Sequence, residues 1–178
     1  MAAEQFVFLD ETSTTIALTR RYARAPRGER ARGSVPRDHG TPTTVLAALS
    51  PTGLGAVMTL EGAANTAAFV VYCRELLCPT LQPGQIVILD NVGFHRADAV
   101  RALIEAAGCR LLFLPPYSPD FNPIEHAVSK LKALLRAIGA RTQAALDAAI
   151  AQVLDAITAA DALGGFQHCG DSPAGQPA

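Results

Sequence analysis

Residues 86–95 read Ile-Val-Ile-Leu-Asp-Asn-Val-Gly-Phe-His, an apolar run that ends abruptly in polar side chains. Four consecutive apolar residues fit a strand that is covered on both faces, as in the parallel part of an α/β sheet. Ligands of such sheets bind beyond the carboxyl ends of the strands. Asp90 follows the run directly, so the sequence predicts that a polar site begins at this residue.

The segments after this strand alternate between helix and strand. Apolar spacing and turn residues predict a helix over 97–107, a strand over 110–114, a helix over 123–138 and an alanine-rich helix over 142–160. Gly108 and Gly139 stand where two of these helices are expected to end, because glycine tolerates the left-handed conformation of a helix C-terminus. Residues 164–178 are expected to form a flexible C-terminal tail.

The first 60 residues contain strand patterns that follow one another closely. Apolar and β-branched residues predict strands over 5–10, 14–21, 43–49 and 55–60, followed by a helix over 66–77. Short connections favour antiparallel neighbours. We therefore expect an α/β domain with a mixed central sheet flanked by helices, in which Asp10 ends the first strand beside Asp90.

Length and composition indicate one globular domain. The chain has 178 residues, of which 49% are hydrophobic, enough to bury a sizeable core. It contains no apolar run of about 18 residues and no secretory signal pattern. The four cysteines lack C-x-x-C spacing, so they are expected to be reduced thiols of a cytoplasmic protein with no membrane partner.

Positive charge is concentrated in one segment, although the formal net charge is −1. Seven arginines and a single glutamate lie between positions 20 and 37, and Pro26, Gly28, Gly33 and Pro36 predict a loop over about 20–40. Such a loop can bind phosphates. The candidate DNA contacts in it are Arg24, Arg27, Arg30 and Arg32. The alternative is a solvated loop with no ligand.

Two aspartates at neighbouring strand ends would repel each other unless a cation lies between them. Two divalent ions held by carboxylates are a known solution for phosphodiester chemistry, and oxygen ligands favour Mg²⁺ or Mn²⁺. Glu125 is a third candidate ligand, but its place near a helix start also fits a simpler role. Asn122 would then be the N-cap, Pro123 the first helical residue, and Glu125 a favourable charge at the helix dipole.

Three stretches resemble the DDE endonuclease domain of bacterial insertion-sequence transposases, relatives of the mariner transposases. They are Phe-Leu-Asp-Glu-Thr (8–12), Ile-Leu-Asp-Asn-Val-Gly-Phe-His (88–95) and Leu-Pro-Pro-Tyr-Ser-Pro-Asp-Phe-Asn-Pro-Ile-Glu-His-Ala-Val-Ser-Lys-Leu-Lys (114–132). The 34 residues between Asp90 and Glu125 match the separation typical of this group. The resemblance covers about residues 5–170, including a terminal Phe-Gln-His-Cys-Gly (166–170). The resemblance implies a ribonuclease-H-like fold in which Asp10, Asp90 and Glu125 hold two Mg²⁺ (or Mn²⁺) ions.

The sequence departs from this family in two respects. Val128 stands where relatives commonly have tryptophan, which concerns packing more than chemistry. Relatives also carry helix-turn-helix modules before the first catalytic strand, and about four residues precede that strand here. We therefore expect residues 1–163 to form the catalytic domain, with the helix-turn-helix region absent and supplied by an upstream reading frame through frameshifting, or lost from a broken gene.

The implied function is metal-dependent DNA strand cleavage followed by strand transfer. The implied partners are transposon ends and target DNA, with a homodimer as the candidate assembly and a nucleoid-associated location in a bacterium. His95, Lys130 and Lys132 are further candidate DNA contacts. For these residues the alternatives are a structural role for the lone histidine and a solvated helix face for the two lysines. The alternatives are a stand-alone ribonuclease-H-like nuclease, and an inactive remnant that only binds DNA or pairs with a complete transposase.

Overall fold

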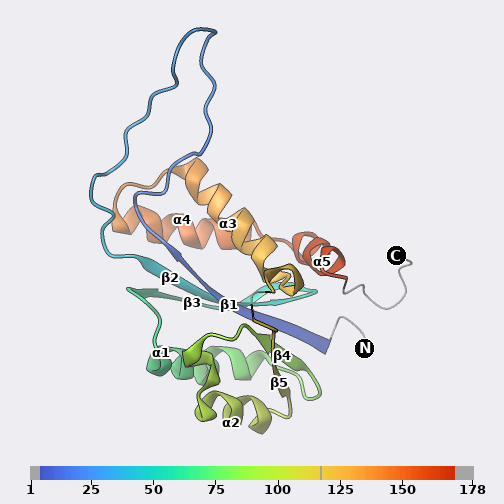
Figure 1. Cartoon of the computed structure of the whole chain (residues 1–178). Helices are drawn as coiled ribbons and strands as arrows, with labels where there is room; N and C mark the ends of the chain where they lie inside the picture. The colour runs from blue at the N-terminus through green and yellow to red at the C-terminus, as the bar shows by residue number, and fades with distance from the viewer. Residues whose placement is uncertain (1–4, 117, 171–178) are drawn as a thin grey trace.

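A five-stranded mixed sheet forms the centre of the computed structural model, which describes residues 5–116 and 118–170 (Figure 1). The strand order is β3-β2-β1-β4-β5. The strands are β1 (Phe6–Thr14), β2 (Thr43–Ser50), β3 (Gly53–Glu61), β4 (Ile86–Leu89) and β5 (Arg110–Phe113). The first three pair antiparallel, whereas β1–β4 and β4–β5 pair parallel, so the predicted mixed sheet is confirmed.

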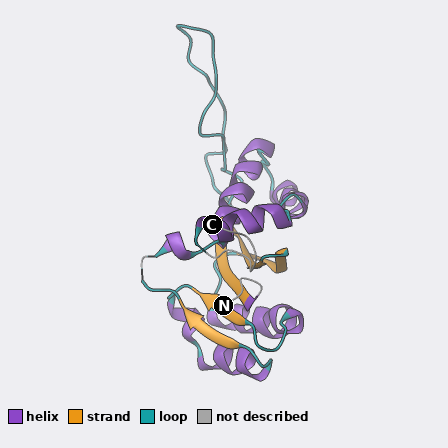
Figure 2. Cartoon of the chain, turned by 90° about the vertical axis from the view of Figure 1, so that its right-hand side faces the viewer, coloured by secondary structure: helices purple, strands orange, loops and turns teal. Residues whose placement is uncertain are grey.

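Helices cover both faces of the sheet (Figures 1 and 2). One face carries α1 (Thr66–Tyr72), which continues as the π-helical turn η2 (Cys73–Leu77) and the 3₁₀ turn η3 (Cys78–Thr80), together with α2 (Asp98–Ala106). The other face carries α3 (Ile124–Ile138), α4 (Gln143–Asp155) and α5 (Ala159–His168). Two more 3₁₀ turns, η4 (Gly93–Arg96) and η5 (Pro119–Phe121), lie in loops that follow β4 and β5.

The two-residue period of β1 divides its side chains between two cores. Val7 and Leu9 pack with the α1–α2 layer, whereas Phe8 packs with α3, α4 and α5. Phe8 makes an edge-to-face contact with Phe166 of α5 at a ring separation of 5.5 Å. Each large apolar side chain buried in this way contributes roughly 1.5–3 kcal/mol, so both faces of β1 are fixed by packing.

The helix boundaries follow local signals in the sequence. The side chain of Asn65 caps α1 by accepting from the backbone N–H of Ala68 at 3.0 Å, and Thr142 caps α4 in the same way. Gly139 ends α3 in the left-handed region at φ 68°, and Gly108 follows α2 at φ 75°. These two predicted helix ends are confirmed.

The strand predicted over 14–21 is wrong. Strand β1 continues to Thr14, and the chain then turns, with Leu18 N–H donating to the Thr15 carbonyl at 3.1 Å. The guanidinium of Arg141 donates to the carbonyls of Ile16 and Leu18 at 2.9 and 2.8 Å. A side chain from a distant part of the chain thus satisfies backbone groups that a strand would have paired, which local β propensity could not indicate.

The prediction for the C-terminal region also needs correction. The helix expected over 142–160 is two helices, because Thr158 and Asp161 form a capping box that starts α5. Gly164 to His168 belong to α5, and the Phe166 side chain is fully buried, so a flexible tail does not begin at residue 164. The rest of the predicted tail, 171–178, lies outside the described residues.

The arginine-rich segment is a loop, as predicted. It connects β1 to β2 and extends far beyond the two helical layers (Figures 1 and 2). All seven arginine side chains between positions 20 and 37 are exposed. None of the described helices combines the length and apolar character needed to cross a bilayer. The four cysteines, all of which lie in the described part of the chain, form no disulfide.

Replacing Arg141 with methionine should lower the free energy of unfolding by about 1–3 kcal/mol, because two backbone carbonyls lose a charged donor. Urea denaturation followed by circular dichroism would measure the change. Arg74→Met is the control, since Arg74 pairs with its exposed neighbour Glu75, and such pairs contribute about 0–1 kcal/mol. Equal effects of the two substitutions would show that Arg141 does not hold the base of the loop.

Candidate active site

The site begins where β1 and β4 stop pairing. Their parallel register runs from Phe6–Ile86 to Leu9–Leu89, and β1 continues alone with β2, with Asp10 opposite Ala47. Asp10 therefore lies inside a strand and not at its end, contrary to the sequence prediction. Asp90 directly follows β4, so the next position in register on each strand carries a carboxylate, as the prediction of adjacent aspartates required.

Asp10 is held by one bond from its own strand and one from the far side of the site. Its Oδ1 accepts from the Glu11 backbone N–H at 2.8 Å, and its Oδ2 accepts from Asn122 Nδ2 at 3.0 Å. Burial raises the pKa of Asp10 to about 7, helped by the negative charges of Glu125, Glu11 and Asp90 and opposed by the bond from Glu11. The site disfavours an ionised Asp10 unless a cation compensates.

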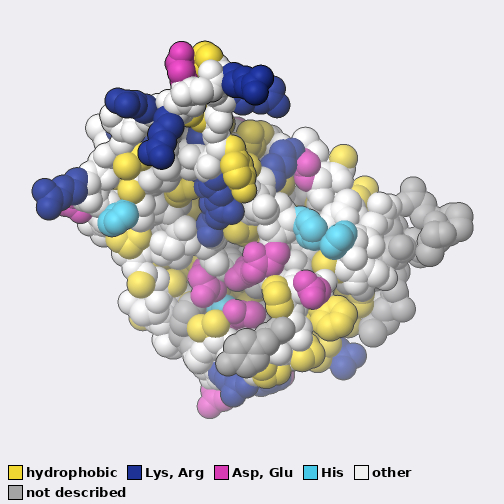
Figure 3. Space-filling view, turned by 45° about the horizontal axis from the view of Figure 1, so that its top comes forward, with side chains coloured by type: hydrophobic (Ala, Val, Ile, Leu, Met, Phe, Trp, Pro, Cys, Tyr) yellow, Lys and Arg dark blue, Asp and Glu magenta, His cyan; other side chains and the backbone are white. Residues whose placement is uncertain are grey.

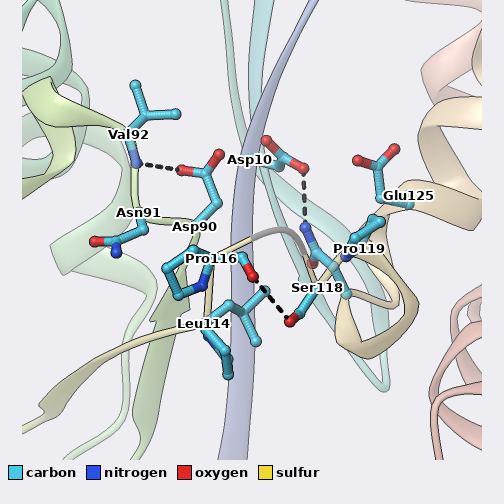
Figure 4. Close-up of a pocket in the computed structure, with 11 residues that line it drawn as sticks. Asp10, Asp90, Asn91, Val92, Leu114, Pro116, Ser118, Pro119 and Glu125 are labelled. Carbon is cyan, nitrogen blue, oxygen red and sulfur yellow. Dashed lines mark hydrogen bonds between the residues drawn. The ribbon is translucent and has the colours of Figure 1, made fainter.

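The three predicted carboxylates line one open cavity of about 410 Å³. Asp10 lies between Asp90 and Glu125, and the carboxylates point toward the same side of the site (Figure 4). Glu125 comes from the first turn of α3 and is exposed. Among residues 5–116 and 118–170, no three acidic, histidine or cysteine side chains are close enough together to hold an ion as they stand.

Asn122 does not cap α3, so that interpretation of the Asn122-Pro123 pair is wrong. None of the described side chains caps this helix, and the Asn122 amide instead donates to Asp10. Asn122 is 4% exposed, and its Oδ1 has no hydrogen-bond partner among the described residues. The sequence could place Asn122 before a helix, but only the fold shows that its side chain faces Asp10.

His95 was a candidate DNA contact with a structural role as the alternative, and its fully buried side chain favours the structural role. Nδ1 lies 2.5 Å from Asp90 Oδ1, and Nε2 lies 3.0 Å from Glu11 Oε2. The ring also packs against Phe69, with centroids 4.5 Å apart. His95 thus links two acids beneath the site and contacts no solvent.

These contacts shift the pKa values of both partners. Burial opposes a charged His95, but the hydrogen bonds and negative charges of Asp90 and Glu11 raise its pKa to about 9. Burial would raise the pKa of Asp90, yet the His95 bond and charge and the Val92 N–H lower it. These contacts therefore favour the ionised form of Asp90, whereas the surroundings of Asp10 disfavour its ionised form. Glu11 was missed because its side chain points to the opposite face of β1 from Asp10.

The remaining predicted contacts lie outside the cavity lining. Lys130 Nζ lies 2.6 Å from Asp161 Oδ2, so this ammonium pairs with α5. Lys132 is half-buried on the same helix. Acidic side chains gather near the centre of the face drawn in Figure 3, and Lys and Arg side chains gather on the side of the projecting loop. Arg24, Arg27, Arg30 and Arg32 belong to that loop and not to the cavity.

The mixed sheet has helices on both faces, and its acidic residues lie beyond the paired part of β1 and β4. This arrangement is ribonuclease-H-like. The family model of the DDE superfamily endonucleases matches residues 5–147. The chain therefore belongs to the DDE superfamily endonucleases, as its motifs indicated. A search of curated protein sequences gave no significant match.

Solved structures of the Mos1 mariner transposase share the fold. A pre-cleavage Mos1 transpososome superposes with a TM-score of 0.75 at 18% identity, covering 93% of this chain and 53% of that one. The Mos1 catalytic domain with Raltegravir and Mg gives a TM-score of 0.69 at 17% identity, covering 93% and 78%. The chain thus spans about half the length of the first of these structures.

Asp10→Asn should stabilise the metal-free protein, and more so as the pH rises. The folded-state pKa of Asp10 lies above its ordinary value of 3.8, so the folded protein binds more protons than the unfolded chain between pH 4 and 7. Stability from this group is present at low pH and is lost as the pH rises through about 7. Melting in EDTA from pH 4 to 8 should show the variant gaining a few degrees over wild type.

Asp155→Asn is the control, because Asp155 is exposed at the end of α4. Its difference from wild type should vary little across the same pH range. A constant difference for Asp10→Asn would mean that Asp10 ionises as freely as an exposed carboxylate.

Proposed function

We propose that the chain is the catalytic domain of a transposase, which cleaves DNA strands and transfers them with the help of two divalent metal ions. The observation that carries the proposal is that Asp10, Asp90 and Glu125 line one open cavity. Asp10 lies in β1, Asp90 directly follows β4, and Glu125 lies in α3. Membership of the DDE superfamily endonucleases supports the reaction class, and the residues that line the cavity are the candidates that carry it out.

The donor chemistry of the residues present suits Mg²⁺ or Mn²⁺. Carboxylate oxygens are hard ligands of the type that these ions prefer. The raised pKa of Asp10 indicates a site that lacks positive charge, and the buried Oδ1 of Asn122, which has no hydrogen-bond partner among the described residues, is a further oxygen acceptor there. Asp10, Asp90 and Glu125 would hold the ions, which would activate the attacking hydroxyl and stabilise the leaving oxygen.

The chain's own residues prepare Asp10 and Asp90 for this role in different ways. Asn122 holds one oxygen of Asp10, and the Glu11 N–H holds the other. His95 holds Oδ1 of Asp90 from below and is itself fixed by Glu11. Hydrogen-bond partners of this kind orient metal ligands and are worth about 10–100-fold in metal affinity or activity. Glu125 depends instead on the placement of α3.

The partners follow from the same proposal. Solved Mos1 structures include a paired-end complex with the left transposon end and paired-end complexes with Mn and with Mg, and we propose transposon ends and target DNA for this chain. The exposed arginines of the projecting loop are suited to the phosphate backbone. A homodimer, and a helix-turn-helix half supplied by an upstream frame, complete the proposed assembly in a bacterial insertion sequence. The proposed catalytic domain comprises residues 1–163, as predicted, and the remainder of α5 up to His168.

Asp90→Asn should reduce metal-dependent nicking of duplex DNA by more than about 100-fold, because even the partners of metal ligands are worth about 10–100-fold. The substitution keeps the shape of the side chain, so the protein should remain folded. The assay uses Mg²⁺ or Mn²⁺ and a supercoiled plasmid. Asp98→Asn is the matched control, because Asp98 is exposed at the start of α2 and should change nicking less than about twofold.

Equal nicking by wild type and Asp90→Asn would refute the proposed mechanism. Cleavage of RNA–DNA hybrids without any strand joining would favour the ribonuclease-H-like nuclease. DNA binding by a folded wild-type protein that cleaves nothing would favour the inactive remnant.

The arginine loop gives a separate prediction about binding. Replacing Arg24, Arg27, Arg30 and Arg32 with glutamine should flatten the salt dependence of DNA binding, by about 0.9 in log–log slope for each phosphate that the loop no longer neutralises. Fluorescence anisotropy between about 50 and 200 mM salt would measure the slope. A control variant replaces three arginines on the α1–α2 side, namely Arg74, Arg101 and Arg110. The same slope change per charge in both variants would mean that the loop has no special role.

A further inference from the structure

Helix α5 lies beyond residue 147, where the family match ends, yet it packs against the two elements that carry Asp10 and Glu125. Phe166 contacts Phe8, two residues before Asp10 on the same side of β1. Gly165, the residue before it, lies against the Pro123 carbonyl at the entry to α3. One helix turn therefore contacts both β1, which carries Asp10, and the entry to α3, which carries Glu125.

The contact at Gly165 leaves no room for a side chain. A Cβ at this position would lie 2.9 Å from the Pro123 carbonyl oxygen and 3.6 Å from His126 Cβ. The first of these neighbours is backbone, so it cannot be displaced without moving the start of α3. Glu125 stands in that first turn, and a shift there moves its carboxylate relative to Asp10.

No described side chain caps the start of α3, because the Asn122 side chain is bonded to Asp10. Capping by a side chain is typically worth about 1 kcal/mol, and here packing against α5 replaces it as the constraint on position. The His126 ring adds an edge-to-face contact with His168 at 4.6 Å. Gly165 and His168 of α5 therefore both contact the first turn of α3 or the residue before it.

A second attachment fixes α5 at its other end. Asp161 Oδ2 accepts from the backbone N–H and the hydroxyl of Thr158, and it also pairs with Lys130 Nζ at 2.6 Å. Lys130 lies on α3, so the two helices are joined both near Glu125 and more than one turn further along. Two attachments restrain rotation of α3 as well as its translation.

We propose that Gly165 is a positioning residue, whose close contact with Pro123 fixes where the first turn of α3, and with it the metal ligand Glu125, lies relative to Asp10. This inference rests on the proposed function, since it assigns the placement of a metal ligand. It extends the functional site to a helix that carries no ligand of its own.

The test compares two neighbouring glycines of the same helix in the full chain. Gly165→Ala should weaken Mn²⁺ binding by about 10–100-fold, measured by isothermal titration calorimetry without DNA. Gly164→Ala is the matched control, because a Cβ there meets nothing within 4 Å. That variant should bind Mn²⁺ like wild type and melt at the same or a higher temperature, since alanine is the better helix former.

A second control separates positioning from general loss of stability. Val153→Ala removes buried volume from α4 in the same core, away from Pro123, and should lower the melting temperature while leaving Mn²⁺ affinity unchanged. If Gly165→Ala does not fold, Asp161→Asn gives the answer, because it breaks the charge pair with Lys130 without a steric clash. We expect that variant to weaken Mn²⁺ binding as well.

The outcomes distinguish this inference from the proposed function. Wild-type protein that binds no Mn²⁺, or binds it as well as Asp90→Asn does, would overturn the metal site itself. If Gly165→Ala folds and binds Mn²⁺ with wild-type affinity, only the role of α5 is overturned. If Gly165→Ala does not fold, wild-type affinity in a folded Asp161→Asn protein has the same meaning. Equal loss of affinity in Val153→Ala would also overturn it.

Discussion

The parting of β1 from β4 after the Leu9–Leu89 pair is the constraint on which the site depends. Up to that pair the two strands are joined by backbone hydrogen bonds and covered on both faces. Beyond it β1 continues along β2 only, which opens the space that the cavity occupies. The next residue on each strand is an aspartate. The sheet thus supplies two carboxylates in register and leaves only the third to be brought by another element.

The alternation of side chains along β1 gives neighbouring acids different roles. Asp10 faces the α3 layer and is bonded to Asn122, whereas Glu11 faces the opposite layer and contacts His95. His95 then reaches Asp90 from below the cavity. Its charge keeps Asp90 ionised, while burial and three nearby acids raise the pKa of Asp10 to about 7. The two aspartates therefore differ in electrostatics although they are adjacent in register.

The third carboxylate is placed by helix packing. Helix α3 enters the site without a side-chain cap, since Asn122 is engaged by Asp10. Its start lies against Gly165 of α5, and Phe166 of the same helix packs on β1 behind Asp10. Helix α5 thus packs directly against the elements that carry Asp10 and Glu125. The arginine loop does not line the cavity, and Arg141 fixes its base by donating to two backbone carbonyls.

The sequence by itself determined the strand over 86–89, the helix ends at Gly108 and Gly139, the exposed arginine loop and the family, because these depend on short-range patterns. It named Asp10, Asp90 and Glu125 through motifs, and the fold brings all three to one cavity. It misplaced the strand over 14–21 and the helix over 142–160, where Arg141 and the Thr158–Asp161 box override local propensity. It also misjudged Asn122 and could not decide between a DNA contact and a structural role for His95, because which side chain faces which acid is decided by contacts between residues distant in the chain. Only the tertiary structure could supply those contacts.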